Sequence, residues 1–243
     1  MKNQADWVPT KFEMSRGRLR GSRNGRELGV GSRLISDLVA AQYDRHLRRH
    51  AVGRLLDLGC GKVPLYLAYA PFVTEITCVD WGPGEYIDVH CDLAKPLPFD
   101  DARFDTIILS DVLEHIPEPD LLWREMARIL AANGTIVMNV PFYYSVHAHP
   151  HDYYRYTNFA LERFVEASGL KLVYLVPVGG VVEIFGDLIA KVLSKGGRIG
   201  EPLAAFVQTV VLRFGRSRPG ARVMSVSSRH FPLGYFMIAQ RPG

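Results

Sequence analysis

The chain has 243 residues, of which 48% are hydrophobic and 22% are charged. This length and composition indicate a sizeable globular core, and they exclude wholesale disorder and a fibrous protein. The net charge of +4 conceals an uneven distribution: residues 1–50 carry 11 Lys and Arg against 5 Asp and Glu, residues 51–190 carry 9 against 19, and residues 191–230 carry 8 against 1. A functional interpretation therefore has to account for an acidic middle between two basic segments.

The cysteines and the apolar runs bear on the cellular compartment of the protein. Cys60, Cys78 and Cys91 lie in separate segments, and their odd number argues for free thiols in a reducing compartment. No signal-like apolar stretch lies near the N-terminus, and no run reaches the roughly 18 apolar residues that span a bilayer. We therefore expect a cytoplasmic protein, with peripheral contact at the inner face of the membrane as a further expectation.

Strand and helix patterns alternate along most of the chain. Helical spacing starts near Ser32, and further helices are expected near Pro64, over 118–132 and over 158–168. Strands are expected over 54–58, 75–80, 86–89, 106–110, 135–140, 170–178 and 231–239. This alternation is typical of an α/β fold whose parallel sheet is covered by helices on both faces.

The same pattern predicts how the chain is organised. Residues 1–50 are expected to form a basic arm and a helix, and residues 51–180 the Rossmann-like core. Residues 181–230 are expected to form a basic helical insertion, after which residues 231–243 supply the last strand of the core. We therefore expect one α/β domain with two additions.

The segment Leu-Leu-Asp-Leu-Gly-Cys-Gly at 55–61 is the most informative part of the sequence. It predicts a buried strand that ends in a glycine turn, and ligands of open parallel sheets bind at the carboxyl ends of strands. Gly59 and Gly61 have no side chain there to exclude a ligand. The turn lacks the third glycine of a dinucleotide fingerprint and the ending of a phosphate-binding loop, which weakens both interpretations.

Carboxylates also lie at or just beyond the ends of the next two expected strands. Asp80 ends the second expected strand, where a carboxylate can accept from both hydroxyls of a ribose. Asp92 and Leu93 lie just beyond the third, where an adenine edge can be recognised. The alternative for each Asp, taken alone, is a cap or turn residue.

These segments together resemble the class I S-adenosylmethionine-dependent methyltransferases, in their type-11-like branch. The matching segments are LLDLGCG at 55–61, VD at 79–80, CDLAKPLPF at 91–99, FDTIILSDVLEHIP at 104–117, EMARIL at 125–130 and NGTIVMNVP at 133–141. The resemblance implies a mostly parallel sheet of seven strands with the last one antiparallel, and S-adenosyl-L-methionine as cofactor.

The resemblance also implies residue roles at the cofactor. Asp57 would orient the methionyl ammonium, and Gly59 and Gly61 would make room for the methionyl part. Asp80 would hold the ribose. The adenine would be met by Asp92 with Leu93, and Ser110 would present its backbone to the methionyl part.

Two regions offer a base for methyl transfer. His115 follows the fourth expected strand, at the edge of the sheet that faces the cofactor. The second region is the histidine- and tyrosine-rich segment 141–157, which resembles that of bacterial methyltransferases associated with surface polysaccharides and glycolipids. There His149 and His151 are further candidates for the base. The alternative for both regions is a structural role.

The same segment offers contacts for a polar acceptor. Tyr143 and Tyr153 are expected to form stacking walls, and Arg155 to anchor an anion, beside Asp152. His147, His149 and His151 alternate as metal ligands do on an extended chain. Pro150 breaks that regularity and no Cys or Glu completes the set, so we expect no metal.

The insertion contains two apolar helical stripes, over 181–193 and 203–214, followed by several arginines. In the first helix the stripe lies opposite Glu183 and Asp187. Such helices fit peripheral membrane contact through 181–222 or a homodimer contact. Plain packing on the domain is the alternative. The arginines do not alternate with aromatic residues, so nucleic acid is not an expected partner.

The sequence therefore predicts a methyltransferase that transfers the methyl group to a hydroxyl of a small or lipid-linked polar acceptor, such as a sugar. The enzymatic alternative is methylation of another metabolite, such as a quinone or a natural product. RNA methylation and a non-catalytic cofactor-binding protein are the remaining alternatives.

Overall fold

The computed structural model describes all 243 residues. The chain forms two compact units, which are described separately. The first contains Met1–Val8, Arg45–Val176 and Tyr235–Gly243, and the second contains Pro9–Asp44 and Pro177–Gly234. The arm expected over residues 1–50 is thus divided between the units. Residues 1–8 and 45–50 belong with the core, and residues 9–44 belong with the insertion.

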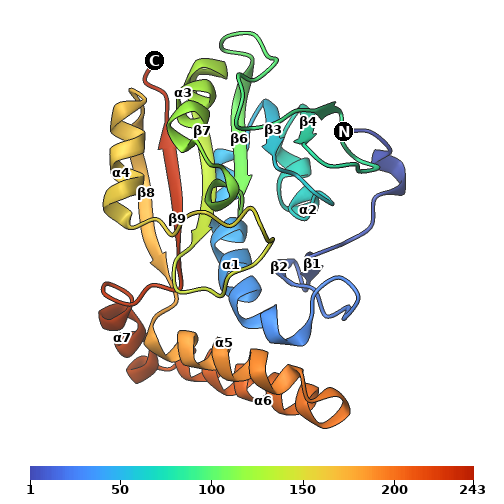
Figure 1. Cartoon of the computed structure of the whole chain (residues 1–243), viewed down its shortest axis with the longest axis vertical. Coiled ribbons are helices and arrows are strands. Elements are labelled where there is room, and N and C mark those ends of the chain that lie inside the picture. Colours follow the sequence, from blue (N-terminus) through green and yellow to red (C-terminus); the bar gives the residue numbers. More distant parts are fainter. The chain divides into compact units, whose positions relative to one another are not determined.

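The first unit is built on a seven-stranded sheet (Figure 1). The strands, in chain order, are β3 (Arg54–Leu58), β4 (Glu75–Asp80), β5 (Val89–His90), β6 (Phe104–Ser110), β7 (Leu130–Pro141), β8 (Lys171–Val178) and β9 (Gly234–Gln240). Their order in the sheet is β5-β4-β3-β6-β7-β9-β8. The sheet is mostly parallel with the last strand antiparallel, as the resemblance implied.

The register places the ends of three strands together. Strand β3 pairs in parallel with β4 on one side, through Leu58 opposite Val79, and with β6 on the other, through Asp57 opposite Ile108. The strand order therefore reverses at β3, which is the point where open α/β sheets bind ligands.

Helices α2 (Tyr66–Tyr69), α3 (Pro119–Ile129) and α4 (Asn158–Ala167) also belong to the first unit. The core between sheet and helices is apolar, and Trp123 of α3 stacks on Phe164 of α4 with the ring centroids 6.0 Å apart. Side chains of this size dominate the free energy gained from burial.

The second unit is mainly helical. It contains α5 (Val181–Ser194), α6 (Gly197–Arg216) and α7 (Arg218–Ser227), together with most of α1 (Arg33–His50). Helices α5 and α6 approach closely where a Cβ on Gly186 would lie 2.7 Å from a methyl group of Val211. No helix of the chain is long and apolar enough to cross a membrane.

A hairpin in the second unit was not expected from the sequence. Strands β1 (Phe12–Ser15) and β2 (Arg18–Gly21) pair antiparallel around Arg16 and Gly17, which both have positive φ. Two left-handed residues form the tight turn that suits the twist of a hairpin. The dipeptide Arg16-Gly17 was the available sequence signal for this turn. The basic composition of the segment instead suggested an irregular arm.

Candidate functional site

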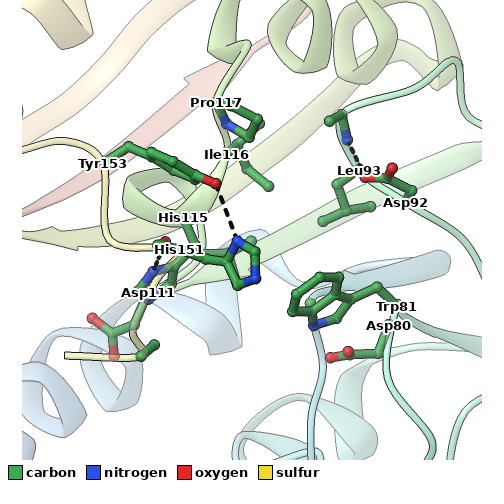
Figure 2. Close-up of a pocket in the computed structure, with 14 residues that line it drawn as sticks. Asp80, Trp81, Asp92, Leu93, Asp111, His115, Ile116, Pro117, His151 and Tyr153 are labelled. Atoms are coloured by element: carbon green, nitrogen blue, oxygen red, sulfur yellow. Dashed lines mark hydrogen bonds between the residues drawn. The ribbon is translucent and has the colours of Figure 1, made fainter.

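A cavity of about 380 Å³ opens at the carboxyl ends of β3, β4 and β6 (Figure 2). Its size lies within the range of small-molecule sites. The lining residues are Gly59, Asp80, Trp81, Asp92, Leu93, Ala94, Asp111, Val112, His115, Ile116, Pro117, Ala148, His151 and Tyr153. Carboxylates and imidazoles therefore share the cavity with apolar and aromatic walls.

The glycine turn after β3 forms one wall. Gly59 has φ +69°, and a Cβ there would lie 2.5 Å from a methyl group of Val112. Its N–H donates to the carbonyl of Val79 at 2.8 Å, which fixes the turn onto β4. Gly61 has φ +49° and open space where a Cβ would be, but it is not among the lining residues. Both positions therefore require glycine for their backbone conformation.

Asp80 and Asp92 lie on the cavity wall as expected. The carboxylate of Asp80 accepts from the N–H of Gly61 at 2.8 Å and from that of Gly82 at 3.1 Å, so it is held in place at the end of β4. Asp92 accepts from the N–H of Ala94, and the buried side chain of Leu93 lies beside it. Two oriented carboxylates remain accessible from the cavity.

Asp57 and Ser110 do not line the cavity. Asp57 is buried, and Tyr69 donates its hydroxyl to the carboxylate at 2.9 Å. Burial raises the pKa of Asp57 to about 7, and the nearby charge of Asp80 adds to the rise. The Ser110 hydroxyl donates to the side-chain oxygen of Asn139. The structure thus gives these two predicted cofactor residues partners within the protein.

His115 and His151 both reach the cavity. The imidazole of His151 lies between Tyr153 and Trp81 in Figure 2, with Nδ1 3.1 Å from the Tyr153 hydroxyl and the ring edge-on to Trp81 at a centroid distance of 4.9 Å. The Nδ1 atom of His115 lies 2.8 Å from the carbonyl oxygen of His151. Because a carbonyl only accepts, His115 carries its proton on Nδ1 when neutral.

The other predicted residues of segment 141–157 lie outside the cavity. His149 and Tyr143 are exposed and do not line it. Arg155 donates to both oxygens of Asp152, at 2.6 and 2.7 Å, and this bidentate pair holds the pKa of Asp152 well below its usual range. The expected anion anchor is therefore occupied by an internal carboxylate, and the pair holds the loop together.

A histidine cluster forms at a different place from the one considered in the sequence. His147 does not gather with His149 and His151; its ring instead contacts that of His115 at a centroid distance of 4.8 Å. Both rings lie beside the buried Glu114. Burial lowers the pKa of His147, which favours its neutral form.

Residues 56–138 match the methyltransferase domain family. A ubiquinone biosynthesis O-methyltransferase of Xanthomonas euvesicatoria is 28% identical over 106 residues, covering 37% of this chain and 43% of that protein. An uncharacterised methyltransferase of Mycobacterium leprae is 31% identical over 121 residues, covering 44% and 45%. The chain thus spans less than half the length of these curated relatives.

Solved structures agree on the fold. A putative methyltransferase of Bacillus halodurans is 16% identical with a TM-score of 0.55, covering 86% of this chain and all of that one. A phosphoethanolamine N-methyltransferase of Haemonchus contortus, solved with S-adenosylhomocysteine, is 14% identical with a TM-score of 0.53, covering 88% and 57%. The core therefore has the fold of the class I methyltransferases, and residues 56–138 within it match their domain family. S-adenosylmethionine is its cofactor.

The cavity of this methyltransferase domain fits the cofactor chemically. Asp80 offers a fixed carboxylate to ribose hydroxyls, and Leu93 and Ile116 offer apolar surface to an adenine ring. The carboxylates around the cavity also complement a sulfonium and an ammonium group. The individual contacts of Asp57, Gly59, Gly61, Asp80, Asp92, Leu93 and Ser110 with the cofactor stay predictions.

Sequence reasoning missed several residues of the methyltransferase domain's cavity. Trp81 follows the predicted ribose carboxylate and is 67% exposed, and Asp111 lines the wall with φ +53°. Trp81 gave a signal, because a large aromatic side chain directly after a strand end is costly to expose without a partner. Glu114, which does not line the cavity, gave no signal, because its contact with His147 depends on the path of a distant loop.

Proposed function

We propose that the chain is an S-adenosylmethionine-dependent methyltransferase that methylates a hydroxyl group of a polar acceptor, with a sugar as the first candidate. The observation that carries this proposal is the position of the His151 imidazole in the cavity wall, between two aromatic side chains. Bound cofactor supplies an activated methyl group. The protein's residues must therefore align the acceptor and remove its proton.

His151 is the base in this proposal. In the tautomer that this role requires, Nδ1–H donates to the Tyr153 hydroxyl oxygen, which orients the ring, and Nε2 holds the lone pair that takes the proton of the acceptor. His115 is less suited, because its Nε2 faces the carboxylate of Glu114 at 3.7 Å. His149 is outside the cavity and is not retained as a base. Trp81 and Tyr153 present ring faces and edges on which an acceptor ring can pack.

A quinol is the second candidate acceptor. The ubiquinone biosynthesis O-methyltransferase among the relatives favours it, because a phenolic hydroxyl presents the same reaction. Both candidates can be attached to a lipid. The exposed apolar side chains of α5 and α6 support an acceptor that is met at a membrane surface.

Transfer of a radiolabelled methyl group tests the proposal. The purified protein is incubated with labelled S-adenosylmethionine and with glycan, lipid, quinone or RNA extracts, and we expect label in a glycan, glycolipid or quinol product. His151→Ala should lower the rate by about 10²–10⁴-fold, with cofactor affinity unchanged. His149→Ala, in the same loop, is the matched control and should retain the rate. Label only in RNA, or full activity of His151→Ala, would contradict the proposal.

A further inference from the structure

Three side chains from two separate segments converge beside the cavity. Glu114 and His115 lie in a short 3-10 helix, Leu113–His115, and His147 lies in the loop between β7 and α4. Their nearest ligand atoms all lie within 4.8 Å of one another. Glu114 is fully buried, and the two imidazoles are partly buried. One buried carboxylate and two partly buried imidazoles therefore lie close together.

The hydrogen bonds at the far side of each ring determine which nitrogen faces Glu114 with a lone pair. Nδ1 of His115 lies 2.8 Å from the carbonyl oxygen of His151. Nδ1 of His147 lies 3.2 Å from the carbonyl oxygen of Ser145 and 3.3 Å from a carboxylate oxygen of Asp152. Carbonyl and carboxylate oxygens only accept, so each neutral ring holds its hydrogen on Nδ1 and a lone pair on Nε2.

These two lone pairs face the same carboxylate. The Oε1 atom of Glu114 lies 3.7 Å from Nε2 of His115 and 3.8 Å from Nε2 of His147. An arrangement of two nitrogen lone pairs and a carboxylate in a buried place is repulsive unless a proton or a metal cation lies among them. The proton would be held by the carboxyl group or by one imidazole.

The geometry points to a metal cation. We propose that Glu114, His115 and His147 form a site for a divalent transition metal of the zinc class. Two imidazole nitrogens with one carboxylate are a frequent donor set for such ions. Imidazoles that bind metal also usually donate their other N–H to a carbonyl or carboxylate, as both rings do here.

The spacing is compatible with the site. Bonds of about 2.0–2.2 Å in a tetrahedral arrangement separate the ligand atoms by about 3.4 Å. The two separations from the Glu114 oxygen, 3.7 and 3.8 Å, exceed this by a few tenths of an ångström, and all three ligand atoms lie within 4.8 Å of one another. Binding of a cation requires side-chain rotations that bring the two imidazoles closer together. His115 is also a wall of the cavity, so the cation would lie next to the place where an acceptor binds. The site itself does not depend on the proposed transfer reaction.

Direct metal binding tests the proposal without any assay of activity. The intact protein is treated with a chelator, dialysed, and titrated with Zn²⁺ in a calorimeter. We expect one tight site per chain and a higher melting temperature in the presence of zinc, because a ligand that binds only the folded state stabilises it. The spectrum of the Co²⁺-loaded protein would report nitrogen and oxygen ligation.

Two variants make the test specific. His147→Ala, in an exposed loop, should fold and should lower zinc affinity by at least about 100-fold, since the loss of a ligand exceeds the 10–100-fold cost of losing a residue that orients one. His149→Ala, two residues along the same loop, should bind zinc as the unchanged protein does. Absence of binding at micromolar Zn²⁺, or equal affinity in His147→Ala, would overturn the proposal and assign the charge to a proton.

Discussion

Asp57 is a carboxylate that the fold keeps away from water. It lies in β3, an interior strand flanked by β4 and β6, where its side chain is buried and accepts a hydrogen bond from Tyr69. Burial disfavours the ionised form, and the charge of Asp80 opposes it further. The pKa of about 7 therefore places a titrating group directly below the glycine turn.

This shift predicts a pH dependence of stability. Between pH 4 and pH 7 the folded protein holds a proton on Asp57 that the unfolded chain has released, so the free energy of unfolding falls as the pH rises through that window. Each pKa unit corresponds to about 1.4 kcal/mol, so the fall is on the order of a few kcal/mol. Asp57→Asn removes this dependence.

Urea unfolding of the two proteins at several pH values measures it. The difference in unfolding free energy between Asp57→Asn and the unchanged protein should shift in favour of the variant from pH 4 to pH 7. A difference that is constant across this range would show that Asp57 has an ordinary pKa.

Single residues differ in how far the sequence predicts them. The positions of Gly59 and Asp80 follow from a strand pattern and its end, and the structure places both on the cavity. The role of Arg155 could not be predicted, because an arginine suits both the binding of an acceptor anion and an ion pair within the protein. Its partnership with Asp152 depends on the path of the loop, which local propensity does not specify.

At the scale of elements, α5 is inverted relative to the usual amphipathic helix. Its carboxylates Glu183 and Asp187 are buried, where Glu183 accepts from the N–H of Gly180 and Asp187 pairs with Lys191. Its apolar stripe is exposed in this chain, with Phe185 at 61% and Val192 at 71%. The sequence pattern located this apolar stripe correctly. The sequence left packing of the stripe on the domain as an alternative, and in the structure much of the stripe is exposed.

Helix α6 exposes apolar side chains as well, including Ile199, Leu203, Phe206 and Val210. These side chains and the stripe of α5 are together called the helical apolar face. Exposed patches of this kind indicate an apolar partner. The basic residues Arg213, Arg216, Arg218 and Arg222 flank it at the end of α6 and in α7, and this charge favours an anionic membrane surface as the partner.

Binding to lipid vesicles tests this element. We expect co-sedimentation with anionic vesicles that weakens with added salt. Phe185→Ser with Phe206→Ser should reduce binding by at least about tenfold, because each buried phenylalanine contributes about 1.5–3 kcal/mol. Phe159→Ser, in α4 of the first unit and at least as exposed, is the control. Salt-independent dimers that the double variant dissociates would contradict the membrane assignment.

Other elements were predicted with different success. The strands at Arg54–Leu58 and Glu75–Asp80 match their predictions, because buried parallel strands form clear apolar runs between turns. The third strand is only Val89–His90, and the helix expected near Pro64 reduces to Tyr66–Tyr69. Short elements at an edge depend on tertiary contacts that no local pattern contains.

At the scale of the whole chain, the division of charge acquires a physical meaning. The acidic residues 51–190 include the carboxylates of the cavity, and carboxylates suit a cofactor that carries a sulfonium and an ammonium group. The basic segments lie largely in the second unit, where the helical apolar face is found. The negative charge thus lies around the cofactor cavity, and the positive charge lies in the unit that carries the helical apolar face.

Calorimetric titration with S-adenosylmethionine tests the central claim most directly. The account predicts one binding site per chain. It also predicts at least about a tenfold loss of affinity in Asp80→Ala, since hydrogen bonds to a charged group contribute about 1.5–3 kcal/mol. Asp100→Ala, an exposed carboxylate outside the cavity, should bind as the unchanged protein does. No binding at millimolar cofactor, or equal affinity in Asp80→Ala, would contradict the account.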